Sequence, residues 1–110
     1  MRTPEETELI VLRALCQETI GGSLRADAAR ILPGYVWREP AHQAMFSCLT
    51  AIPAVEPEAM RRILLACLTR KGFPDISLEI FFEPQPLTRR QATRLIQSLA
   101  RTPPFGTDPS

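Results

Sequence analysis

The sequence has little of what most catalytic and metal-binding proteins use. Its 110 residues include one histidine, one tyrosine and one tryptophan, and aromatic residues make up 6% of the chain. With a single histidine, few arrangements of side chains for acid–base catalysis are possible, because a catalytic histidine needs partner groups beside it. Gly21-Gly22-Ser23 could cradle a phosphate, but it lacks the lysine and the spacing of a P-loop. We therefore predict that the chain is not an enzyme and holds no cofactor or metal.

Long apolar runs and a strong excess of one charge are also missing. No stretch is long enough to span a bilayer, and the N-terminus has no signal-peptide pattern. The net charge is +1, from 13 basic and 12 acidic side chains, so no global field favours a membrane or nucleic acid. We expect a cytoplasmic protein without membrane contact.

Cysteines are few and far apart in the sequence. Cys16, Cys48 and Cys67 fall on predicted apolar helix faces, and their number is odd. Reduced thiols in a core fit this pattern better than a disulfide framework or a zinc site. The sequence therefore predicts free, buried cysteines.

The sequence does contain the helix start and stop signals of a small helical domain. Capping boxes start helices at Thr3, with Glu6, and at Thr88, with Gln91, and Ser23 can cap another. Most of the prolines fall at predicted helix starts or in the tail. We predict an all-α bundle of five to six helices in one domain, residues 1–101, followed by a disordered tail, residues 102–110.

The predicted helices follow from apolar residues at helical spacing. They occupy residues 4 to 20, 24 to 32, 40 to 52, 57 to 71 and 89 to 101. Residues 73–84 alternate like a strand, but no second strand is visible to pair with them, so we favour a short helix there. The predicted core consists of Leu12, Leu15, Trp37, Met45, Phe46, Leu49, Leu64, Leu68, Leu95 and Leu99.

The first predicted helix carries more apolar surface than one core-facing stripe needs. Leu9, Val11 and Cys16 lie beside Leu12 and Leu15. In a small domain such a second face commonly meets another subunit. We therefore predict a homodimer. The alternative is that residues 73–84, with Phe73, Phe81 and Phe82, fold back over this helix within one chain.

Two polar features of the sequence are candidates for a functional role. His42 lies in the first turn of a predicted helix, where it either serves as a general base or metal ligand or bonds the backbone; we favour the backbone. Arg90, Arg94 and Arg101 share one face of the last helix, with Arg89 adjacent. This face is either simply solvated or contacts phosphate or an acidic partner.

One stretch carries a family resemblance. Glu8, Leu12 and Leu15, followed by a helix and by the run from Tyr35 to Phe46, resemble the N-terminal domain of DnaB-type replicative helicases. The helicase-binding C-terminal domain of bacterial primases looks similar too. The resemblance covers about residues 5–72, and the matching residues in the central run are Val36 or Trp37, Pro40, Ala41, His42, Met45 and Phe46.

The resemblance implies a small all-α bundle that works through protein–protein contacts. In the helicase this domain pairs with its own copies and meets the primase. This chain has no helicase motor, and nothing helicase-like is recognised after Gly72. We expect a helicase- or primase-type interaction module that binds another helical protein; the alternative is a small DNA-associated factor using Arg90, Arg94 and Arg101. The expected partner-binding residues are Leu9, Val11, Trp37, His42, Phe81 and Phe82.

Overall fold

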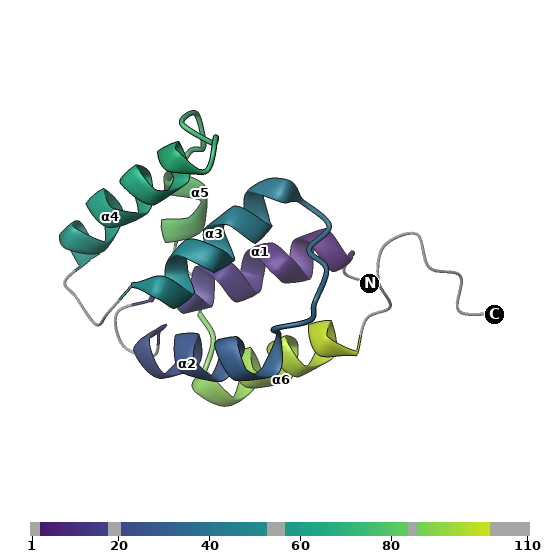
Figure 1. The fold of residues 1–110 in the computed structure, drawn as a ribbon. Coiled ribbons are helices and arrows are strands. Elements are labelled where there is room, and N and C mark those ends of the chain that lie inside the picture. The colour runs from purple at the N-terminus through teal and green to yellow at the C-terminus, as the bar shows by residue number, and fades with distance from the viewer. Residues whose placement is uncertain (1–2, 18–20, 53–56, 84–85, 102–110) are drawn as a thin grey trace.

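Figure 1 shows the helices of the chain and the loops that join them. The computed structural model describes residues 3–17, 21–52, 57–83 and 86–101, and within these ranges it contains six helices and no strand. The helices are α1 (Pro4–Leu15), α2 (Gly21–Ile31), α3 (Pro40–Ala51), α4 (Pro57–Arg70), α5 (Glu79–Phe82) and α6 (Arg89–Ala100). The predicted all-α fold is confirmed. The expected tail, residues 102–110, lies outside the described residues.

Two helices begin at the predicted capping boxes. The Thr3 hydroxyl accepts a hydrogen bond from the Glu6 backbone N–H at 3.2 Å, and the Glu6 carboxylate accepts one from the Thr3 N–H. Thr88 and Gln91 make the same reciprocal pair at the start of α6. These contacts satisfy backbone donors that the first helical turn leaves without partners.

The start of α2 differs from the prediction. It begins at Gly21, so Ser23 is its third residue and not its N-cap. The helix before it ends at Leu15, short of the expected Gly21-Gly22 stop. A side chain explains this end: Arg25 is buried and donates a hydrogen bond to the Leu15 carbonyl at 3.0 Å. It thereby satisfies one of the carbonyls that a helix C-terminus leaves free.

Helix α1 lies at the centre of the molecule and packs against α2, α3, α5 and α6 (Figure 1). This arrangement accounts for its broad apolar surface within a single chain. The short helix α5 covers part of it, and Phe81 is buried there, as the alternative to the homodimer proposed. The prediction of a short helix within residues 73–84 is confirmed. A homodimer stays a prediction, but the apolar breadth of α1 no longer supports it.

Helix α4 packs on α3 and stands apart from the central helices (Figure 1). Met60, Leu64 and Leu68 form its buried stripe. A disulfide joins Cys48 of α3 to Cys67 of α4, across a Cα–Cα distance of 6.1 Å. The prediction of three reduced thiols is wrong for this pair, because the consecutive helices α3 and α4 pack side by side and bring the sulfurs together. Cys16 is a free, buried thiol as predicted.

Trp37 anchors the loop between α2 and α3 to the core. Its ring lies 4.9 Å from that of Phe46 and 5.0 Å from that of Tyr35, centroid to centroid. Eight of the ten predicted core residues are buried, and the other two, Phe46 and Leu95, are partly buried and pack against the core. Among the described residues, none of the helices combines the length and apolar character needed to cross a bilayer.

Candidate functional site

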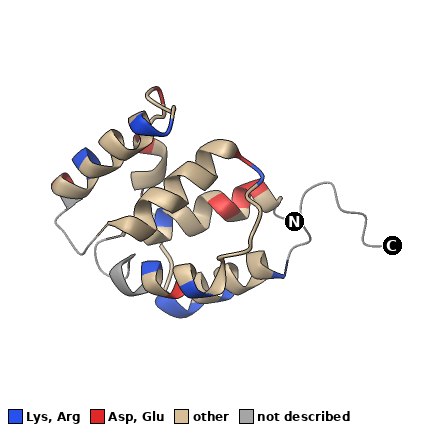
Figure 2. Ribbon diagram, viewed as in Figure 1, with Lys and Arg blue, Asp and Glu red and all other residues tan. Residues whose placement is uncertain are grey.

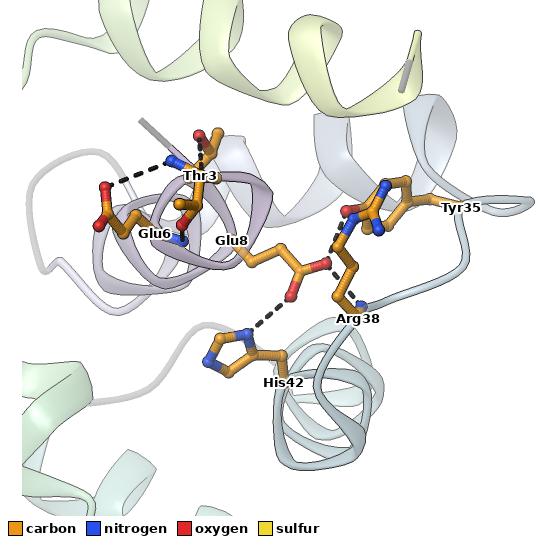
Figure 3. Close-up of polar contacts among 7 residues, drawn as sticks. Thr3, Glu6, Glu8, Tyr35, Arg38 and His42 are labelled. Atoms are coloured by element: carbon orange, nitrogen blue, oxygen red, sulfur yellow. Dashed lines mark hydrogen bonds and ion pairs between the residues drawn. The ribbon is translucent and has the colours of Figure 1, made fainter. Parts of the chain in front are cut away.

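The most unusual polar group in the described residues is the carboxylate of Glu8. Its side chain is fully buried, although it comes from the middle of α1 (Figure 3). One carboxylate oxygen accepts hydrogen bonds from the Tyr35 hydroxyl, at 2.6 Å, and from the backbone N–H of Arg38, at 2.8 Å. The other oxygen lies 2.8 Å from Nδ1 of His42. We call Glu8, Tyr35, Arg38 and His42 the Glu8 cluster.

Three segments meet in the Glu8 cluster. Glu8 comes from α1, Tyr35 and Arg38 come from the loop after α2, and His42 is the third residue of α3. Pro40 occupies the first helical position of α3 and Glu39 is extended, which turns the loop into the helix beside Glu8. The cluster therefore fastens the α2–α3 loop and the start of α3 onto α1.

The electrostatics of the cluster favour an ionised Glu8. Burial acts to raise the pKa of Glu8, but the hydrogen bonds from His42, Tyr35 and Arg38 outweigh it, and the pKa lies below its ordinary value. Burial and the bond to Glu8 raise the pKa of the Tyr35 hydroxyl. Because an ionised carboxylate only accepts hydrogen bonds, Nδ1 of His42 carries the proton in this contact.

A histidine oriented by a carboxylate is an arrangement that general bases use, so its surroundings decide its role. The side chain of His42 is 12% exposed, and its ring meets that of Phe81 edge to face at 6.1 Å. The His42 ring contacts the side chains of Glu8 and Phe81, and neither offers a hydroxyl or thiol that His42 could activate as a nucleophile. Burial raises the pKa of Cys16 to about 12, which keeps this thiol protonated and unreactive. Within the described ranges no three His, Cys, Asp or Glu side chains gather as a metal site requires.

The structure separates the six expected partner-binding residues. Val11, Trp37 and Phe81 are buried in the core, contrary to the expectation that they form a docking surface. Their large apolar side chains are covered by helices of the same chain. Leu9 and Phe82 are partly buried against the core, and His42 belongs to the Glu8 cluster.

Exposed apolar side chains occur on both α4 and α5. The guanidinium of Arg61 lies 4.2 Å from the centre of the Phe82 ring and 3.6 Å from the Glu79 carboxylate. Leu65, one turn after Arg61 on α4, is 47% exposed, and Ile80 on α5 is 42% exposed. We call Arg61, Leu65, Ile80 and Phe82 the α4–α5 surface. It presents two large apolar side chains to solvent beside a cation and an aromatic ring.

A basic face lies elsewhere, on α6. Arg90 and Arg94 line an open groove of about 430 Å³ together with Arg89, Thr93 and Gln97. Arg101 follows the helix as its C-cap and is exposed, outside the lining of that groove. Arg89 is held by Asp27 of α2 at 2.8 Å. The structure thus brings Arg90 and Arg94 together as the helical spacing predicts.

No protein-family model, curated protein or solved structure matches this chain. The resemblance to the DnaB-type N-terminal domain accordingly rests on the residue pattern alone.

Sequence reasoning missed the Glu8 cluster and misplaced His42. His42 was expected to bond the backbone near the start of its helix, but it bonds a buried carboxylate from α1. One signal could have found this contact. Glu8 precedes Leu12 by four residues and Leu15 by seven, which places an acidic side chain on the apolar stripe of α1. A buried carboxylate needs donors, and those come from residues about 30 positions away in the chain.

Proposed function

We propose that the chain is a non-enzymatic interaction module of the helicase/primase type, which binds a helical partner protein through its α4–α5 surface. The observation that carries the proposal is the exposure of Leu65 on α4 and of Ile80 on α5, two helices that the contacts of Arg61 connect. Large apolar side chains grouped on a surface are typical of protein interaction sites. Arginine and aromatic residues are enriched among the residues that dominate binding energy.

The position of α4 supports this choice. Among the described helices, α4 packs on α3, and its contacts with α5 are those of the Arg61 side chain. Arg61 reaches from α4 to Glu79 and Phe82 on α5, which sets a charged rim beside the apolar side chains. Exposed apolar side chains on two neighbouring helices can pack against the apolar face of an amphipathic helix.

The residues behind the family resemblance also support an interaction module. Glu8 contacts His42 at 2.8 Å, and Trp37 packs on Phe46 at 4.9 Å. These four residues therefore contact one another as parts of the fold, and the His42 ring also meets the Phe81 ring edge to face. A histidine used in this way serves stability and leaves binding to other surfaces.

The proposal is tested by titrating the purified chain with purified replicative helicase and primase from the same organism, using calorimetry. Leu65→Lys places a charge in the α4–α5 surface and is expected to weaken binding at least tenfold. Ile63→Lys is the matched control, because Ile63 is also exposed on α4 but lies about 200° around the helix from Leu65.

Two results would contradict the proposal. One is the absence of binding to either protein at micromolar concentration. The other is equal loss of binding in Leu65→Lys and Ile63→Lys, since the α4–α5 surface would then have no special part. Sedimentation of the free chain, measured alongside, reports whether the partner at this surface is instead a second copy of the chain.

A further inference from the structure

We propose that the exposed face of α6 binds the phosphate backbone of nucleic acid without reading its sequence. This face consists of Arg90, Arg94 and Arg101, and we call it the α6 ridge. It is formed by residues other than those of the α4–α5 surface, so the inference goes beyond the proposed interaction with a helical protein.

The three arginines lie opposite the buried side of α6. Ala92, Ile96 and Leu99 are the buried residues of this helix. At about 100° per residue, Arg90, Arg94 and Arg101 fall within about 40° of one another on the far side of it. The ridge runs for about 16 Å along the helix axis, given a rise of about 1.5 Å per residue. Three cations are therefore set in a row and turned to solvent.

Charge is segregated along this edge of the molecule. The whole chain carries a net charge of only +1, yet residues 89–101 include four arginines and no acidic residue. Asp27 of α2, the acidic side chain next to α6, already pairs with Arg30 at 3.1 Å and Arg89 at 2.8 Å. Figure 2 shows the basic positions gathered along α2 and α6. The local field of the α6 ridge is thus positive in a nearly neutral protein.

The chemistry of the ridge fits phosphate better than a folded protein partner. Gln97 and Ser98 are the exposed residues between Arg94 and Arg101, apart from Ala100, and no large apolar side chain is exposed there. Protein interfaces need apolar or aromatic anchors at their centre. Arginine forks bind phosphate oxygens in pairs of hydrogen bonds, and Thr93 and Gln97 add donors in the same groove.

The same ridge lacks what sequence reading requires. Its described residues include no aromatic side chain on which a base could stack. Binding should therefore depend on charge and on salt, and little on base sequence.

Fluorescence anisotropy with a labelled mixed-sequence DNA duplex tests this inference with the full chain. With three phosphate contacts, the affinity is expected to fall roughly 40-fold between about 50 and about 200 mM salt. The double variant Arg90→Ala/Arg94→Ala keeps one contact, so its affinity should be weaker at low salt and fall only roughly 3.5-fold over that range. Arg62→Ala/Arg70→Ala is the matched control, because it removes two exposed arginines from α4; it should behave like the unaltered chain.

Three outcomes would overturn the inference. They are no measurable binding at the low salt concentration, equal losses in the two double variants, and competition by polyglutamate as effective as competition by unlabelled duplex. The last result would assign the ridge to an acidic protein. Circular dichroism of each variant verifies that the helices are intact.

Discussion

Replacement of Glu8 by alanine should destabilise the fold more than any surface substitution. The change removes the acceptor for the Tyr35 hydroxyl, the Arg38 N–H and Nδ1 of His42, all within 2.6 to 2.8 Å. Removing one partner of a buried charged network costs about 3–5 kcal/mol, because the remaining groups stay buried without partners. A domain of this size has a total stability of about 5–15 kcal/mol, so the loss is a large share of it.

Urea unfolding followed by tryptophan fluorescence and by circular dichroism measures this loss. Trp37 is the only tryptophan and lies 5.0 Å from Tyr35, so its fluorescence reports on the Glu8 cluster directly. Glu8→Gln keeps the volume and one acceptor oxygen, and it should lose less, about 1–2 kcal/mol. Glu39→Gln is the control, since Glu39 is exposed and makes no capping hydrogen bond with its side chain. If the free energy of unfolding of Glu8→Ala lay within about 0.5 kcal/mol of that of the unaltered chain, the reasoning would be refuted.

The same carboxylate predicts how stability depends on pH. The pKa of Glu8 is lower in the folded chain than its ordinary value, so its ionised form stabilises the fold. This stabilisation is complete above the ordinary pKa and is lost as the pH falls through the folded pKa. Urea midpoints measured down to acidic pH should show the decline, and Glu8→Gln should remove the part that Glu8 contributes. An unchanged acid profile in Glu8→Gln would assign the decline to other carboxylates.

Two further predictions concern the attachment and the end of α4. Reduction of the Cys48–Cys67 disulfide should lower the free energy of unfolding by about 3 kcal/mol, because it opens a loop closed by two cysteines that are 19 positions apart. Urea unfolding curves with and without a reductant measure this loss, and coincident curves would contradict it. Gly72→Ala should cost about 1–2 kcal/mol, because Gly72 has a φ of 92° that L-residues avoid. Gly34→Ala is the matched control for thermal unfolding, because an added methyl group at Gly34 meets no atom within 4 Å and the φ of Gly34 is not positive. Equal destabilisation by Gly72→Ala and Gly34→Ala would show that the positive φ of Gly72 is not the cause.

Much of the fold could be predicted because its signals are local. The capping boxes at Thr3 and Thr88 and the glycine stop at Gly72 are each written in a few adjacent residues, and the structure has all three. The short helix at α5 followed from the lack of any second strand, since a lone strand leaves backbone groups without partners. These inferences needed no knowledge of the tertiary arrangement.

The rest depends on contacts between distant residues. The role of Arg25 requires the end of α1 to lie beside α2, and the disulfide requires α3 and α4 to pack side by side. The Glu8–His42 contact joins residues 34 positions apart. Helical spacing places each of these side chains on a face, but it does not say which helix meets that face. Val11, expected on an exposed partner-binding surface, is buried in the core for the same reason.

Amide hydrogen exchange of the chain, alone and with purified helicase or primase, tests the proposed function most directly. Binding through the α4–α5 surface predicts slower exchange in Pro57–Arg70 and Glu79–Phe82 when the partner is present, with Arg89–Ala100 unchanged. Protection confined to Arg89–Ala100, or no change anywhere at saturating partner, would contradict the account.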